Sequence, residues 1–138
     1  MNDKAKLLNQ YWTDIYFHLH YPHQDKISHQ VVRILQLVDK KSDVGVNEIS
    51  LSLQISHNTA SEHVKRMIGK GYLRKGRDPL DERRVILSLT EQGEKVLHRN
   101  TSLDEKKLAK ILEQLNGEEE KLVKEALQLL SQRAKECM

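Results

Sequence analysis

The sequence predicts one mostly α-helical domain over residues 1–138, with a single small β-hairpin. Charged residues make up 31% of the chain and aromatic residues only 4%, which is the usage of a helical protein rather than a β-sandwich. Apolar residues recur at steps of three and four over most of the chain, which is the period of an amphipathic helix. Only residues 72–89 combine strand-forming residues with a turn that contains Gly and Pro.

Two helices are expected in the first 40 residues. An apolar stripe near the N-terminus predicts a helix from Asp3 to His20, which ends before Pro22. Ser28 is a good N-cap for the second helix. The apolar residues of that second helix are too many for one narrow stripe, so we expect it to be buried on more than one side.

Two short helices joined by a tight turn are expected next. Apolar residues at positions 46, 49 and 53 have helical spacing, and the pattern breaks at residues 54–56. Ser56 then caps a second helix, which ends at Gly71 in the usual C-terminal manner. The apolar residues of this second helix form one inner face, which leaves a polar and basic outer face.

A β-hairpin with a long, charged tip is expected directly after these helices. Residues 72–75 and 85–89 have the composition of strands, and the turn-forming residues 76–82 separate them. Thr90 caps a further helix, and helical periodicity then resumes to about residue 133 with one break at Asn116-Gly117.

Two short helices followed by a hairpin is the order of a winged helix-turn-helix, in which the second helix enters the major groove of DNA. The charge distribution agrees with this order. Residues 57–84 hold eight basic and four acidic side chains, whereas residues 1–56 are neutral and residues 90–138 have a net charge of −1. A local basic patch on a near-neutral body suits binding to phosphates. We therefore expect residues 46–90 to read double-stranded DNA.

The expected DNA contacts come from the outer face of the second short helix and from the hairpin tip. Asn can pair with adenine, Glu can accept a hydrogen bond from cytosine, and hydroxyl groups suit phosphate oxygens, although a solvated surface would have a similar composition. In the tip, Asp81 is expected to hold the guanidinium group of Arg83 extended, unless the two form an ordinary surface ion pair. The candidate DNA-binding residues are Ser56, His57, Asn58, Thr59, Ser61, Glu62, Lys65, Arg66, Arg77, Asp81, Arg83 and Arg84.

These segments resemble the multiple-antibiotic-resistance regulator (MarR) family of winged helix-turn-helix transcriptional regulators. The run DPLDERRVILSLTEQG at residues 78–93 is similar to that family's wing, in which an aspartate and an arginine two residues later precede an L-x-L-T-x-x-G passage. Motifs carry the resemblance over residues 27–97, and helix order carries it elsewhere. The resemblance implies a homodimer that binds a palindromic operator, usually as a repressor that a small ligand releases.

The helices outside residues 27–97 have apolar stripes that one winged domain leaves uncovered. We therefore expect residues 1–21 and 101–135 to form the homodimer interface. The candidate dimerisation residues are Leu7, Tyr11, Trp12, Ile15, Leu122, Leu127 and Leu130.

Four histidines between residues 18 and 29 suggest a metal site, a ligand- or pH-responsive pocket, or plain surface histidines. Their spacing fits no zinc motif, so we expect no metal and no cofactor. The resemblance places an effector pocket near this junction. The candidate pocket residues are Tyr16, His18, His20 and His29.

Other classes of function have little support in the sequence. We expect no enzyme, because the chain has no catalytic motif, and no disulfide, because Cys137 is its one cysteine. The chain shows neither a signal peptide nor a run of about 18 apolar residues, so we expect a cytoplasmic protein with no membrane partner. The alternative is a winged-helix protein-interaction module without DNA binding, for which Glu62, at a position where the resembled family often has arginine, is an argument.

Overall fold

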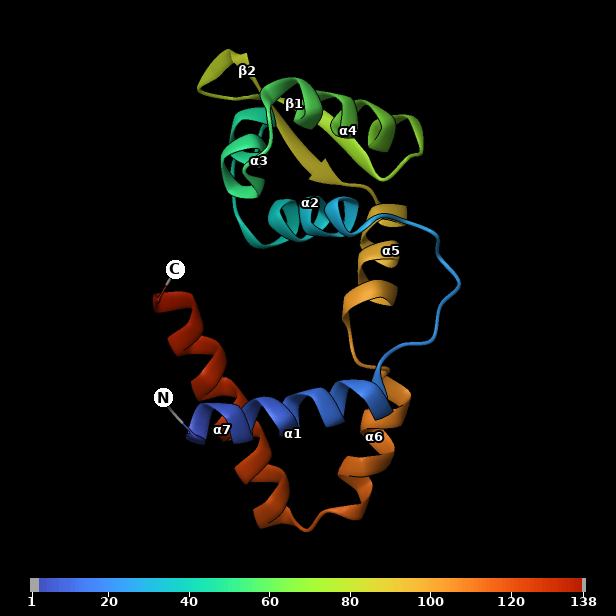
Figure 1. Ribbon diagram of the computed structural model, residues 1–138, viewed down its shortest axis with the longest axis vertical. Helices are drawn as coiled ribbons and strands as arrows, with labels where there is room; N and C mark the ends of the chain where they lie inside the picture. The colour runs from blue at the N-terminus through green and yellow to red at the C-terminus, as the bar shows by residue number, and fades with distance from the viewer. Residues whose placement is uncertain (1–2, 138) are drawn as a thin grey trace. The chain divides into compact units, whose positions relative to one another are not determined.

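The computed structural model describes residues 3–137, which form seven helices and one two-stranded hairpin (Figure 1). The elements are α1 (Asp3–Leu19), α2 (His29–Lys40), α3 (Val46–Leu53), α4 (His57–Gly69), β1 (Leu73–Asp78), β2 (Asp81–Leu89), α5 (Glu91–Thr101), α6 (Glu105–Gln114) and α7 (Gly117–Glu136). They fall into two compact units. The core unit is Tyr21–Ser102, and the terminal-helix unit holds the described residues up to His20 and from Leu103 onward. The expected DNA-reading residues, 46–90, all lie in the core unit.

One hydrophobic cluster holds the core unit together. It takes side chains from α2, α3, α4, the hairpin and α5, so each of these elements has one face fixed against the others. The buried members are Ile34, Leu35, Val38, Val44, Ile49, Ala60, Val64, Met67, Leu73, Leu87, Leu89, Val96 and Leu97. Because Ala60, Val64 and Met67 turn inward, the opposite face of α4 is presented to solvent.

Local hydrogen bonds set the starts of the predicted helices. The Ser28 side chain accepts a hydrogen bond from the backbone N–H of Val31 at the start of α2. Ser56 does the same for α4, and Thr90 does so for α5. All three N-caps predicted from the sequence are therefore confirmed, and with them the starts of three helices.

A left-handed residue makes the tight turn between α3 and α4. Gln54 has a φ of 56°, and its backbone N–H donates to the carbonyl of Ser50. The Ser50 hydroxyl in turn donates to the carbonyl of Ile55 at 2.7 Å. These bonds satisfy backbone groups that the end of α3 leaves open, so the chain reverses within three residues, as the break at residues 54–56 predicts.

The hairpin differs from the expected one, because its strands are longer and its tip is shorter. The sequence predicts strands at residues 72–75 and 85–89, whereas β1 reaches Asp78 and β2 begins at Asp81. The carboxylate of Asp78 accepts a hydrogen bond from the Leu80 N–H at 2.9 Å, which closes the turn over two residues. The outer half of the ribbon is exposed on both faces, so its polar residues form strands without the alternation that a buried strand shows.

The segment that precedes α2 is anchored to α5 through Asp25. Its carboxylate accepts hydrogen bonds from Arg99 Nε at 2.9 Å, Arg99 Nη2 at 3.3 Å and Asn100 Nδ2 at 3.2 Å. The hydrogen bonds from Arg99 lower the pKa of Asp25, although desolvation partly opposes them. The charged form of Asp25 is therefore the form that this anchor stabilises.

Asp25→Asn is expected to lower the free energy of unfolding by about 1 kcal/mol at pH 7, because Arg99 loses its charged partner. A carboxyl whose pKa is lower in the folded state adds stability above its unfolded pKa of about 3.9, and this stability is lost as the pH falls through the folded pKa. Urea unfolding at pH 7 and near pH 3 should show the two proteins converging in acid. Asp39→Asn, which removes an exposed carboxylate from α2, is the control. Equal stability of Asp25→Asn and wild type at pH 7 would contradict the anchor.

The terminal-helix unit consists of α1, α6 and α7, and most of its large apolar side chains are exposed. None of the described residues in these three helices is buried. All seven predicted dimerisation residues lie here, with exposed fractions between 39% for Ile15 and 68% for Leu122. Over residues 3–137, no helix is both long and apolar enough to cross a bilayer.

Candidate nucleic-acid interface

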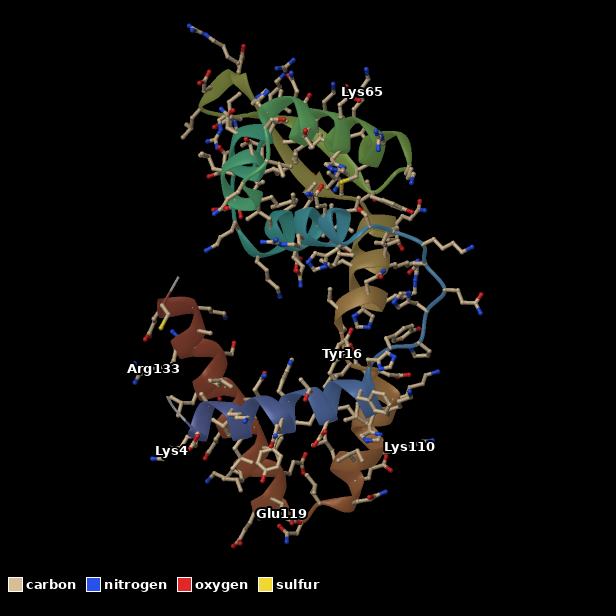
Figure 2. All side chains as sticks on the ribbon, viewed as in Figure 1. Lys4, Tyr16, Lys65, Lys110, Glu119 and Arg133 are labelled. Carbon is tan, nitrogen blue, oxygen red and sulfur yellow. The ribbon has the colours of Figure 1, made fainter. Side chains whose placement is uncertain are left out.

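The outer face of α4 carries the polar side chains that the sequence assigns to DNA. Asn58, Glu62, Lys65 and Arg66 are exposed. Lys65, labelled in Figure 2, lies on the side of α4 that is turned away from α2. His63, on the flank of the helix, forms a 2.7 Å hydrogen bond with Gln30 of α2, which helps to fix the rotation of α4 on the core. The structure thus holds this face in one orientation.

The first turn of α4 exposes a short polar cluster. The Ser56 hydroxyl accepts a hydrogen bond from the backbone N–H of Thr59 at 3.0 Å and donates to the Thr59 hydroxyl at 2.8 Å. The neighbouring His57, Asn58 and Ser61 are exposed. The N-terminus of a helix carries partial positive charge, so this turn favours an anion such as a phosphate.

The hairpin forms the wing, and its tip projects beyond α3 and α4 in Figure 1. Arg77, Asp81 and Arg83 are exposed there. Asp81 does not hold the guanidinium group of Arg83 as the sequence suggested. Its carboxylate accepts a hydrogen bond from the Arg83 backbone N–H at 3.1 Å, because an aspartate at a turn reaches the main chain two residues on more easily than a long side chain. Asp81 therefore shapes the tip and leaves the Arg83 side chain exposed.

Arg84 turns inward, unlike its neighbour. Its Nη2 atom donates to the carbonyl of Asp43 at 2.6 Å and to Glu48 Oε1 at 3.0 Å. Its Nη1 atom lies 3.9 Å from the carboxylate of Asp78. The hydrogen bond to Glu48 raises the pKa of Arg84, and the Coulomb attraction of the nearby acids adds to this effect. Arg84 is a predicted DNA-binding residue, but the structure gives it partners inside the protein.

A cavity of about 550 Å³ lies between α4, the start of α3 and the wing. It brings together five of the predicted DNA-binding residues, which are His57, Ser61, Lys65, Arg83 and Arg84. Lys75 of β1 and Asn47 of α3 also line it, and the sequence prediction missed both. Lys75 belongs to the basic stretch of residues 57–84, so charge alone could have included it. Apolar residues share the lining, but the charged side chains among the lining residues are mostly basic, namely Lys65, Lys75, Arg83 and Arg84 against Glu48, as binding to a phosphate backbone requires.

The predicted effector-pocket residues are divided between the two units. Tyr16 and His18 lie in the last turn of α1, and His20 follows it; the rings of Tyr16 and His20 stack with centroids 5.4 Å apart. The Nδ1 atom of His20 forms a 2.9 Å hydrogen bond with the carbonyl of Tyr16. His29 is the exposed first residue of α2. The pocket stays a prediction. Within residues 3–137, no group of three His, Cys, Asp or Glu side chains is arranged to hold a metal ion.

A polar helix with an exposed outer face, a basic wing and the tight turn between α3 and α4 together define a winged helix-turn-helix protein. A family model described as "Transcriptional regulator SarA/Rot" matches residues 20–100, and the chain belongs to this family. The match and the fold also confirm the resemblance to regulators of the MarR type.

Individual relatives agree with this assignment. The chain is 29% identical over 93 residues to the HTH-type transcriptional regulator BilQ of Clostridium symbiosum, a match that covers 67% of this chain and 65% of BilQ, just under two thirds. The crystal structure of transcriptional regulator Tm0710 from Thermotoga maritima is 27% identical, with a TM-score of 0.57, over 80% of this chain and 78% of that one. Streptococcus pneumoniae FabT, solved in complex with DNA, shares the fold over 97% of this chain and 99% of its own, at 22% identity and a TM-score of 0.58.

Proposed function

We propose that this chain is a cytoplasmic, non-enzymatic regulator of transcription that binds double-stranded DNA as a homodimer at a palindromic operator. We further propose that it acts as a repressor that a small molecule releases. One observation carries the DNA-binding proposal: exposed polar residues of α4 and basic residues of the wing line the same cavity of about 550 Å³. Membership of a family of transcriptional regulators supports it.

The two parts of the interface have different tasks in this proposal. The major groove admits one α-helix, and residues in the first turns of a recognition helix reach the bases. Asn58 and Glu62 offer directional hydrogen bonds there, whereas Lys65 and Arg66 suit phosphates. Arg83 on the wing is long enough to enter an adjacent minor groove or to contact its phosphates. Specificity then comes from α4, and much of the affinity comes from charge.

The homodimer follows from the terminal-helix unit. In proteins most of the stability of a helix comes from packing of its apolar face, and no described residue in α1, α6 or α7 is buried. A second copy of the chain would cover the exposed apolar side chains by symmetry. Two symmetric α4 helices would then face successive turns of the major groove, about 34 Å apart, which requires an operator with two-fold symmetry. Selection of duplexes from a random library tests this, because the recovered sites should be palindromic.

Arg83→Ala is expected to weaken binding to duplex DNA about tenfold and to make the salt dependence of binding shallower by about one phosphate contact. The physical reason is that Arg83 is an exposed cation on the cavity side of the wing. Fluorescence anisotropy over a range of salt concentrations measures both quantities. Arg33→Ala, which removes the same charge from α2, is the matched control and should change neither. If Arg83→Ala changes neither the affinity nor the salt dependence of binding, Arg83 does not contact DNA. Failure of the wild-type chain to bind any duplex at low salt would favour the protein-interaction module instead.

A further inference from the structure

We propose that Glu48 and Arg84 form a clamp that sets the position of the wing relative to α4, so that both residues control DNA binding through geometry. This inference rests on the proposed DNA-binding function. It assigns Arg84 a positioning role in place of the direct DNA contact that its sequence position suggests. We call this pair the Glu48–Arg84 clamp.

The clamp joins segments that are far apart in the sequence. The guanidinium group of Arg84, on β2, bonds to Glu48 near the start of α3 and to the carbonyl of Asp43 in the connection before it. It also lies 3.9 Å from Asp78, at the end of β1. One side chain of the wing therefore contacts both the helix-turn-helix and the opposite strand of the hairpin.

Glu48 is held in place independently of Arg84. Its Oε1 atom accepts a hydrogen bond from the backbone N–H of Gly45 at 2.7 Å, which caps α3. Burial disfavours the charged form of Glu48, but the hydrogen bonds from Gly45 and Arg84 outweigh it and lower the pKa of Glu48. Glu48 is thus a fixed negative charge to which Arg84 can be tied.

The clamp lies where the anchored part of the wing ends. Further toward the core, the Leu87 N–H donates to the carbonyl of Val44 at 2.8 Å. At Gly45 a Cβ atom would lie only 2.9 Å from the carbonyl oxygen of Val85, so this connection runs directly against β2. Beyond Arg84, residues 81–83 of β2 are exposed, and in the register of the hairpin only Asp81 among these three has a partner, which is Asp78 of β1. Without the clamp, the exposed end of the ribbon would have freedom to swing about this point.

The charges around Arg84 also favour positioning over direct contact. Glu48 and Asp78 are both close to its guanidinium group, so much of its positive charge is compensated within the protein. Arg83, the next residue outward, is exposed and has its backbone fixed by Asp81. The clamp therefore sets the direction in which Arg83 leaves the core unit.

Removing the negative charge of Glu48 distinguishes a positioning role from a purely electrostatic role, because the two predict opposite changes in DNA affinity. If only charge matters, Glu48→Gln should strengthen DNA binding, because a carboxylate near phosphates repels them. If the clamp matters, Glu48→Gln should weaken binding, because the wing loses its fixed position. Gln keeps the size of the side chain and can still accept the bond from Gly45, so the cap of α3 is retained.

The test uses the full chain and a labelled duplex recovered with the wild-type protein from a random library. We expect Glu48→Gln and Arg84→Gln each to weaken binding about five- to tenfold, and the double variant to be no weaker than the weaker single variant. Arg84→Lys, which keeps the charge but cannot bridge the two acceptors as a guanidinium group does, should fall between Arg84→Gln and wild type. The salt slope should stay at the wild-type value in all of them. Glu82→Gln, which removes a carboxylate from the same wing outside the clamp, should bind as tightly as wild type or more tightly.

Three outcomes would overturn the clamp: wild-type or tighter binding by Glu48→Gln, multiplicative effects in the double variant, or a salt slope shallower by about one for Arg84→Gln. Amide hydrogen exchange of the DNA-free proteins gives a readout independent of DNA. Residues 75–85 should exchange faster in Glu48→Gln and Arg84→Gln, while α5 and the melting temperature stay as in wild type. If wild type binds no duplex, the proposed function fails, and unchanged exchange in the wing would then overturn the clamp separately.

Discussion

A chain that carries Leu127→Glu and Leu130→Glu is expected to sediment as a monomer and to bind its selected duplex at least about a hundredfold more weakly than wild type. Both leucines are exposed on α7, in a helix with no described residue buried. Two carboxylates in the proposed apolar dimer interface would lose their hydration on pairing, which disfavours the dimer strongly. A monomer binds each half of a palindromic site separately and loses the avidity of two linked recognition helices.

Gln128→Glu with Gln132→Glu is the matched control for this experiment. These changes add the same two charges on the same helix, but at exposed positions away from its apolar side. Sedimentation should find this control dimeric, with tight DNA binding. A wild-type chain that is monomeric at concentrations on the order of micromolar, or a leucine variant that remains dimeric, would contradict the proposed interface.

Gly93→Ala is expected to lower the free energy of unfolding by about 3 kcal/mol, because the added methyl group has no space. A Cβ atom at Gly93 would lie 2.1 Å from the carbonyl oxygen of Tyr72, far inside van der Waals contact. The two segments cannot separate easily, since Thr90 donates its backbone N–H to the same carbonyl and its hydroxyl to that of Gly71. Urea denaturation of the purified variant measures the loss.

Gly69→Ala is the matched control for Gly93→Ala. A Cβ atom at Gly69, the last residue of α4, meets nothing within 4 Å. Alanine is also a better helix former than glycine, so this change should leave stability unchanged or raise it by up to about 1 kcal/mol. If the two glycine variants are equally stable, the close approach at Gly93 is not a constraint on the fold.

Local signals in the sequence predict the helices of the core unit well. Ser28, Ser56 and Thr90 begin helices where their side chains can cap free backbone N–H groups, and this chemistry is visible in a few consecutive residues. The strands of the wing extend further than the sequence predicts, because the signal for a strand is missing in their outer part. Alternation of apolar and polar residues indicates a strand with one buried face, and the outer part of the hairpin has no buried face.

The outer face of α4 was predictable because the helical period places it opposite Ala60, Val64 and Met67. The sequence does not predict in the same way which of Arg83 and Arg84 faces solvent. Both lie at the register shift of the hairpin, where Arg77 pairs with Val85 and Asp78 pairs with Asp81, so the regular alternation of a strand does not assign their directions. Which one faces solvent depends on Glu48, a partner 36 positions earlier in the chain, and such a pairing leaves no pattern in a single sequence.

The sequence alone also does not explain why glycine is required at position 93. The wing motif shows a glycine at this position, but the φ of Gly93 does not lie in the left-handed region that favours glycine. Among the described glycines, only Gly71 has a positive φ. The requirement comes from the backbone of Tyr72, which lies against the first turn of α5. A contact between segments 21 residues apart is a property of the packed structure and not of the local chain.

The unburied terminal helices also bear on how long an unpaired subunit survives. An amphipathic helix whose apolar face stays exposed is prone to fray, and a frayed segment is readily cut by proteases. Given the proposed pairing, newly made subunits that meet no partner are degraded faster than those in pairs. The concentration of the paired regulator then rises more steeply than the rate of its synthesis. A modest drop in synthesis therefore lowers the concentration of the pair by a larger factor.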